Sequence, residues 1–264
     1  MSKPSKEITE KPAASVPTAI VEQLREEANA GFEGATSRDD FAIPFLVILQ
    51  PLSPQLQPGN AEFIEDARPG MILNTVTREL ATAVRVIPVR YTRTFTEWVP
   101  RDAGGGFRGE RGADAVEEFD RLRDPTTGRA KLPNGNDLVD TRNFYVLIID
   151  DKDMPSPAIV SMSSTQIRKA RQWMQIMNGT MLPGRDGRAF RPPMYSSVFI
   201  LTSSQQENKK GKWYGWSIRR HGFVQDTDQY QSASLFNKQI SVNAITVDRN
   251  QAAADGSVID GDEI

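Results

Sequence analysis

The residue types with the clearest chemical use gather in one short stretch of the chain. Residues 205–223 include five basic side chains, four aromatic rings and one acid. Aromatic rings stack on the bases of single-stranded nucleic acid, while lysine and arginine neutralise its phosphates. This stretch therefore predicts a nucleic-acid-binding surface. Its candidate contact residues are Lys209, Lys210, Lys212, Trp213, Arg219 and Arg220.

A second group of basic and aromatic residues surrounds the start of the connection 99–142. Its glycine-rich run 104–112 mixes arginine with one aromatic residue, as RGG segments do, so we expect a flexible loop that contacts nucleic acid. The candidates in this loop are Phe107, Arg108 and Arg111. The strand that precedes the loop adds Arg90, Tyr91, Arg93 and Trp98.

Each of these features also has a structural explanation, which the sequence leaves open. On a strand, Tyr214, Trp216 and Ile218 share one face, and such a face is typical of a core. The lysines of 209–212 also fit a solvated turn, and arginine stems often cover apolar surface. Three helical residues fit a solvated face better than a binding site: Arg168, Lys169 and Arg171.

Asp150, Asp151 and Asp153 form an acidic cluster at the end of a predicted strand. Clustered carboxylates can hold Mg²⁺ for phosphodiester cleavage, which makes a metal-dependent nuclease the alternative function. The same residues also suit a hairpin turn, where aspartate accepts hydrogen bonds from the local backbone. A third alternative is a virion or host-interaction protein whose aromatic residues form a protein interface.

The composition argues against several large classes of protein. The chain has no cysteine and one histidine, which disfavours disulfides, thiolate zinc sites and Ser-His-Asp catalysis. A GxGxxG match at 104–109 does not directly follow a strand, and there is no Walker lysine motif. We therefore expect no enzymatic activity, no cofactor and no bound metal. With no apolar run long enough for a bilayer and no leader, we also expect no membrane association.

Strand patterns dominate the elements that must position these residues. Strands are expected at 83–98, 143–150, 158–162, 195–203 and 212–224, with a polar loop at 204–211 and Pro88 at an edge or a bulge. A helix should follow a capping box at Ser163 and Gln166, and a last helix should start at the cap Asp226. The order β-β-β-α-β-β is that of an OB-fold. We expect a β-rich α+β fold, an elaborated OB-fold-like Greek-key barrel with one helix between strands 3 and 4.

Charge divides the chain into three regions. Residues 1–40, rich in proline and acid, predict a disordered arm with a short helix at 18–30. Residues 41–247 carry 26 basic and 21 acidic groups and form the expected nucleic-acid-binding domain. The sequence leaves open whether this domain forms a homo-oligomer. Residues 248–264 carry one basic and five acidic groups and predict a disordered tail. The candidate partner-binding residues of this tail are Asp260, Asp262, Glu263 and Ile264.

Four short motifs have no chemistry of their own: 41–46 (FAIPFL), 52–54 (LSP), 140–144 (DTRNF) and 163–167 (SSTQI). They resemble a set of tailed-bacteriophage proteins, described as hypothetical or as single-stranded DNA-binding replication proteins with an OB core. The resemblance covers residues 38–245 and implies DNA binding without catalysis, in replication or recombination. It also implies the cytoplasm of an infected bacterial host, with phage replication proteins as partners of the acidic tail. It identifies no individual contact residues.

Overall fold

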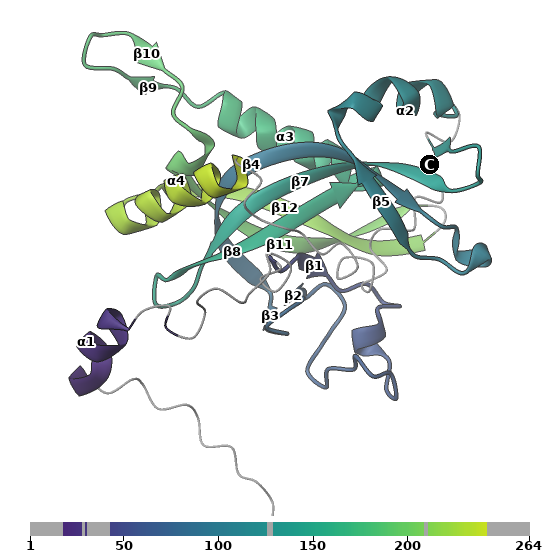
Figure 1. Ribbon diagram of the computed structural model, residues 1–264, viewed down its shortest axis with the longest axis horizontal. Helices are drawn as coiled ribbons and strands as arrows, with labels where there is room; N and C mark the ends of the chain where they lie inside the picture. The colour runs from purple at the N-terminus through teal and green to yellow at the C-terminus, as the bar shows by residue number, and fades with distance from the viewer. Residues whose placement is uncertain (1–17, 28–29, 31–42, 126–128, 209–210, 242–264) are drawn as a thin grey trace, which may run out of the picture.

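The computed structural model describes residues 18–27, 30, 43–125, 129–208 and 211–241 (Figure 1). These residues form a β-rich fold whose strands pair antiparallel, with a few helices packed on the main sheet. The strands are β1 Leu46–Ile48, β2 Ile72–Asn74, β3 Leu80–Ala81, β4 Ala83–Trp98, β5 Phe107–Arg111, β6 Ala130–Lys131, β7 Asp137–Ile149, β8 Pro155–Ser163, β9 Leu182–Pro183, β10 Ala189–Phe190, β11 Ser197–Asn208 and β12 Gly211–Phe223. The α-helices are α1 Thr18–Glu26, α2 Val116–Leu122, α3 Ile167–Asn178 and α4 Thr227–Ser241; short 3-10 turns are Pro54–Leu56, Arg101–Ala103, Ala113–Ala115, Ser164–Gln166 and Met194–Ser196.

The long strand β4 organises the main sheet. On one side β4 pairs with β7 along its whole length, and on the other it pairs with β11 at one end and β5 at the other. β7 in turn pairs with β8 and β6, and β12 pairs with β11. The spatial order β11-β4-β7-β8 is that of a Greek key. As predicted, α3 lies between the third and fourth of the long strands in chain order.

The main sheet does not close into a barrel, so the predicted closure is not observed. The segment that contains β1 lies across the opening instead. Phe45 forms a parallel bridge with Ile159 of β8. At the other end, the Gln50 side-chain amide accepts a hydrogen bond from the Tyr214 N–H and donates one to the Tyr214 carbonyl, both at 2.9 Å. A glutamine side chain thus occupies part of the exposed backbone edge of β12, where a further strand would otherwise pair.

Three clusters of buried residues form the core. One face of the sheet packs against α3, where Trp173 is fully buried and stacks on Phe144 with 4.3 Å between ring centroids. The opposite face packs against α4 through its buried Phe236 and Ile240. A third cluster joins α2 to the far end of β4 and β7 through the Phe95–Phe119 contact, with 5.1 Å between centroids. Along the β4–β7 ribbon, a polar section therefore lies between the parts covered by α3 and α2.

Local details confirm some sequence predictions and correct others. The pairing of β4 and β7 shifts register between Pro88 and Arg90, which is the bulge expected from a proline without an N–H group. Asp226 accepts a hydrogen bond from the Gln229 N–H, as expected of an N-cap. The capping box at Ser163 is wrong: this side chain makes no cap hydrogen bond, and a 3-10 turn precedes α3.

The predicted loop 204–211 is also wrong, because β11 continues to Asn208 and β12 begins at Gly211. The two strands hydrogen-bond along this whole length, so the polar residues expected in a loop form a paired ribbon. In the N-terminal region, α1 confirms the helix predicted from residue 18. The rest of the predicted arm, residues 1–40, is mostly outside the described residues, as is the whole tail 248–264. No described helix is long and apolar enough to cross a bilayer.

Candidate nucleic-acid interface

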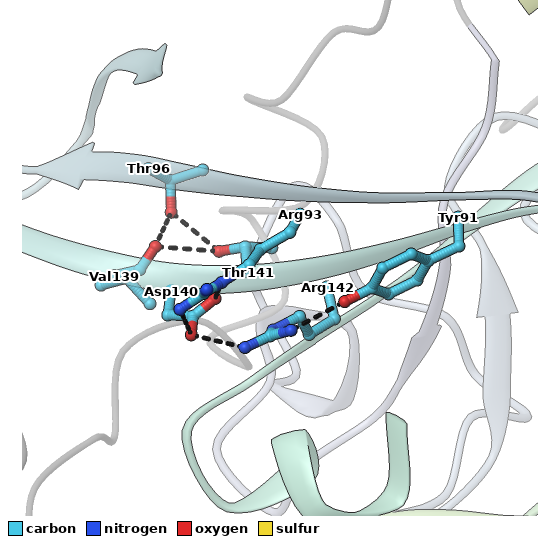
Figure 2. A network of polar contacts seen from close by, with 7 residues as sticks. All are labelled: Tyr91, Arg93, Thr96, Val139, Asp140, Thr141 and Arg142. Atoms are coloured by element: carbon cyan, nitrogen blue, oxygen red, sulfur yellow. Dashed lines mark hydrogen bonds and ion pairs between the residues drawn. The ribbon is translucent and has the colours of Figure 1, made fainter. Parts of the chain in front are cut away.

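A network of charged side chains lies on the β4–β7 ribbon between α3 and α2. The Asp140 carboxylate binds Arg93 through two hydrogen bonds, at 3.0 and 2.8 Å, and also binds Arg142 at 2.8 Å. Arg142 donates a further hydrogen bond, at 2.7 Å, to the Tyr91 hydroxyl (Figure 2). The antiparallel register produces this group, because Arg93 lies directly opposite Arg142 and Tyr91 opposite Phe144. The network thus unites two predicted site residues with two that the sequence interpretation did not select.

The guanidinium groups of Arg93 and Arg142 share the one carboxylate of Asp140, so these three side chains together carry a net positive charge. The Asp140 and Arg142 side chains are only 8% and 11% exposed, whereas Arg93 is 28% exposed. Burial alone would lower the pKa of Arg142, but hydrogen bonds to Tyr91 and Asp140 raise it above its ordinary value. Arg142 therefore serves as a fixed cation that holds the ribbon together, and Arg93 is the more exposed of the two guanidinium groups.

The opposite face of the same ribbon carries a ladder of hydroxyl and amide groups. Thr96 contacts Thr141 at 3.1 Å, and Figure 2 shows this pair on the other side of the strands from Asp140. Asn143, fully buried, donates to Thr94 and accepts from Ser161. Trp98 belongs to this side: it is 4% exposed, and its Nε1 donates to Thr96 at 2.9 Å. The stacking role predicted for Trp98 does not fit this arrangement, because no open ring face remains for a base.

The glycine-rich connection is more ordered than the sequence predicts. Residues 107–111 form β5, which pairs with β4, and Phe107 packs edge-on against Trp98 with 5.4 Å between centroids. Arg111 binds Glu118 at 2.7 Å and Glu97 at 3.2 Å, so its charge is already paired. Arg108 is exposed on this strand. Of the three candidates in this connection, Arg108 is exposed, whereas Phe107 and Arg111 are half-buried.

Replacing Glu97 with glutamine should reduce stability in a pH-dependent way. Asn136, Asn134 and Arg111 donate hydrogen bonds to this carboxylate, and they hold its pKa below the ordinary value despite burial. A depressed folded-state pKa stabilises the protein above the unfolded-state pKa and loses that effect as the pH falls through the folded value. We expect Glu97→Gln to cost about 2 kcal/mol at pH 7, and progressively less as the pH falls below the unfolded-state pKa, measured by urea unfolding.

The control for this prediction is Glu117→Gln, which changes an exposed carboxylate on α2. It should leave the unfolding free energy within about 0.5 kcal/mol of wild type at pH 7 and at pH 3. A cost for Glu97→Gln that stays constant between pH 7 and pH 3 would show that the carboxylate charge is not its source.

The β11–β12 hairpin carries the remaining exposed candidates. Trp216 is 3% exposed and joins the core with Tyr214 and Ile218, which confirms the face assigned to them from alternation. The other face of the hairpin, here called the outer hairpin face, bears Trp213 and Arg219 on β12. Its further members are Ser217 on β12 and Ile200, Thr202, Ser204 and Gln206 on β11.

The outer hairpin face combines a half-buried aromatic ring with an exposed cation. Trp213 is half-buried, and its Nε1 has no hydrogen-bond partner in the described part of the chain. Arg219 is exposed. At the end of the hairpin Lys212 is 60% exposed, with a long 3.6 Å ion pair to Glu207. Lys209 and Lys210 lie outside the described residues.

Two other predicted arginines are used inside the fold. Arg220 lies over the Phe223 ring, 4.3 Å from its centroid, and donates to Ser197 at 3.3 Å. Arg90 donates to the Ser241 hydroxyl at the end of α4. Both therefore have structural partners that a nucleic acid would have to displace.

The β11–β12 hairpin and the three candidates on β5, Phe107, Arg108 and Arg111, occupy different places along β4. β11 pairs with β4 at residues 83–86, whereas β5 pairs with it at residues 95–98. These are opposite ends of one long, curved strand of the main sheet (Figure 1). The candidate residues therefore fall into three separate places: the charged network around Asp140, the strand β5 and the β11–β12 hairpin. They do not form one continuous group along β4.

The aspartates of the alternative nuclease site form the turn between β7 and β8. Asp150 accepts hydrogen bonds from the backbone N–H groups of Lys152 and Met154, at 2.9 and 2.8 Å. Asp153 pairs with Arg85 at 3.1 Å. Within the described ranges, no three His, Asp or Glu side chains are grouped closely enough to hold a metal ion. The turn hydrogen bonds account for the position of this cluster.

One basic region was missed by the sequence interpretation. Residues 164–191 carry six basic side chains and one acid, and they form α3 followed by the small β9–β10 hairpin. α3 itself has no acidic residue. The available signal is this local excess of basic residues. In the sequence interpretation, the basic residues of α3 belong to a solvated face, and none of residues 185–191 is selected.

Comparison with known proteins places the chain in a family. A family model described as "Pam3 phage gp34-like protein" matches residues 11–246, which is most of the chain. No curated protein and no solved structure matches it. The match indicates a phage protein, as the resemblance of the sequence motifs implied, and the single-stranded DNA-binding role stays a prediction. The chain therefore belongs to the Pam3 phage gp34-like protein family.

Proposed function

We propose that this protein binds single-stranded DNA with little sequence preference and protects it during phage DNA replication or recombination in the infected bacterial cell. The strand order supports this proposal, because β4, β7, β8, β11 and β12 follow a Greek key with α3 between β8 and β11. An OB-fold is a partly open Greek-key barrel of five strands that binds oligonucleotides on a strand face and on the loops beside it. We propose that these five strands form an OB-like core, opened by the β1 segment.

The observation that carries the proposal is the presence of Trp213 and the exposed Arg219 on the outer hairpin face, with the exposed Lys212 at the end of the same strand. Trp213 and Arg219 lie on the same side of β12, six residues apart, or roughly 20 Å along an extended strand. This spacing suits a strand of several nucleotides, with one base stacked on the indole and a phosphate near the guanidinium. Polar side chains of β11 line the face between them, and no acid lies on it.

Binding should quench tryptophan fluorescence through one residue. The chain has four tryptophans, of which Trp98, Trp173 and Trp216 are 4% exposed or less. Trp213 alone is positioned to stack on a base, so saturating oligo-dT should lower the emission of wild type but not of Trp213→Phe. Binding of both proteins is followed independently by the anisotropy of a labelled oligonucleotide. Quenching of similar size in Trp213→Phe would contradict the stacking role.

The proposed function is tested by anisotropy of labelled oligo-dT at low salt, with unlabelled competitors. Single strands of other sequences should compete within about tenfold of oligo-dT, and duplex DNA should compete far less well. An RNA competitor of the same length measures the preference for DNA. Equal competition by duplex and single strands would contradict the proposal. Shortening of the labelled strand in Mg²⁺, but not in EDTA, would favour the nuclease instead.

A further inference from the structure

The β9–β10 hairpin, residues 181–191, projects from the body of the protein beyond the end of α3 (Figure 1). It is a separate two-stranded sheet held by only two residue pairs, Ala189 with Pro183 and Phe190 with Leu182. Its turn is tight: the Gly184 N–H donates to the Arg188 carbonyl at 2.8 Å, and Gly187 adopts a φ of 76°. The chain therefore builds a defined arm without using it to bury core.

The arm exposes both cationic and apolar groups. Every residue from Arg185 to Arg191 is exposed, and Met181 and Phe190 are each 49% exposed. The one acid in the arm, Asp186, is used by the turn, where it accepts a hydrogen bond from the Arg188 N–H. At its base, Arg191 donates to the Asn178 carbonyl at 2.9 Å, which fastens the arm to the C-terminal end of α3.

We propose that this arm is a second nucleic-acid contact, in which Arg185 and Arg188 bind phosphates and Phe190 stacks on a base. This inference rests on the proposed single-strand binding and extends it beyond the outer hairpin face. Charge complementarity selects the partner, because exposed arginines beside an exposed aromatic ring match a polyanion that carries bases. An apolar protein partner would leave the arginine charges without counterions.

The position of the arm suits a continuous path for one strand. α3 begins beside β12, where the Gln166 side chain accepts a hydrogen bond from the Trp216 N–H at 3.0 Å. The helix then runs 12 residues, about 18 Å, toward the arm. Arg168 and Arg171 are exposed along it, three residues apart and therefore on one side. The outer hairpin face is the side of β12 away from α3, so a long strand bound there reaches the arm by passing around the β12 edge and then along this basic helix, and a very short one does not.

The test measures the affinity of the double variant Arg185→Glu with Arg188→Glu for oligo-dT of two lengths, about 8 and about 40 nucleotides. Wild type is measured with the same two strands. With the long strand, this variant should bind about tenfold or more weakly than wild type, and its salt slope should fall in magnitude by about 1.4, or 0.7 for each lost contact. With the short strand, its affinity should equal that of wild type. Phe190→Ala should weaken long-strand binding by about fivefold or more. A charge-matched control, Lys152→Glu with Lys238→Glu, reverses two exposed cations elsewhere and should leave the length dependence unchanged.

Each alternative result overturns the inference in a recognisable way. If wild type binds both strands and the arm variant binds them equally well, the arm is not a contact, although the proposed function stands. If the arm variant binds the short and the long strand more weakly by the same factor, the arm does not extend the site. If the variant changes the mass of the free protein in analytical ultracentrifugation without changing DNA affinity, the arm joins subunits. If wild type binds neither strand, both the function and the arm are wrong.

Discussion

Replacing Asp140 with asparagine is expected to lower the free energy of unfolding by about 3 kcal/mol. The carboxylate is 8% exposed and balances Arg93 and Arg142, the second of which is 11% exposed. Asparagine has the same size but no charge, and its amide N–H₂ group would face guanidinium donors. Removing one member of a buried ion pair leaves an uncompensated charge, which is the costly case. Urea unfolding at neutral pH measures the effect.

A second variant separates charge compensation from packing. Combining Asp140→Leu with Arg93→Met and Arg142→Met removes the whole charged group and keeps apolar side chains in its place. Because buried ion pairs contribute little beyond the cost of desolvating them, this triple variant should recover most of the stability lost in Asp140→Asn. A loss below about 1 kcal/mol for Asp140→Asn would show that solvent already screens the network.

Reversing Lys212 and Arg219 together should weaken binding of single-stranded DNA by about tenfold to a hundredfold near 0.1 M salt. Both side chains are exposed, Lys212 at the end of the hairpin and Arg219 on the outer hairpin face. Each reversal removes a phosphate contact and adds repulsion, so the salt slope should also fall in magnitude by about 1.4. Neither residue contributes to the core clusters, so the unfolding free energy should stay near that of wild type.

The charge-matched control for this pair is again Lys152→Glu with Lys238→Glu. Lys152 lies in the β7–β8 turn and Lys238 on α4, and both are exposed. The control changes the net charge of the protein by the same amount, so it should reproduce only the general electrostatic part of the loss. Equal weakening by both double variants would mean that the hairpin has no special role in binding.

Elements with strong local patterns could be predicted from the sequence. The bounds of β4 follow from its run of β-branched and aromatic residues, and the bulge follows from Pro88. The apolar stripe of α3 and the cap at Asp226 are likewise local signals. The capping box failed because Gln166 binds the Trp216 backbone, 50 residues away, and a local motif cannot show such a partner.

The candidate site was less accessible to sequence reasoning, because it depends on register. Tyr91 and Arg93 were selected for their types, but their partners Asp140 and Arg142 lie on β7 and meet them only through strand pairing. Trp98 was selected as an aromatic residue near arginines, and its burial depends on the fold of β5 over it. The β9–β10 arm was missed because its strands have two residues each, too few for any periodicity.

The salt dependence of wild-type binding to oligo-dT tests the central claim most directly. If at least three cations of the β11–β12 hairpin and its surroundings neutralise phosphates, the logarithm of the binding constant should fall linearly with the logarithm of salt concentration, with a slope of about −2 or steeper. Anisotropy titrations at several NaCl concentrations measure this slope. A flat dependence, or no detectable binding at low salt, would contradict single-strand binding through these cations.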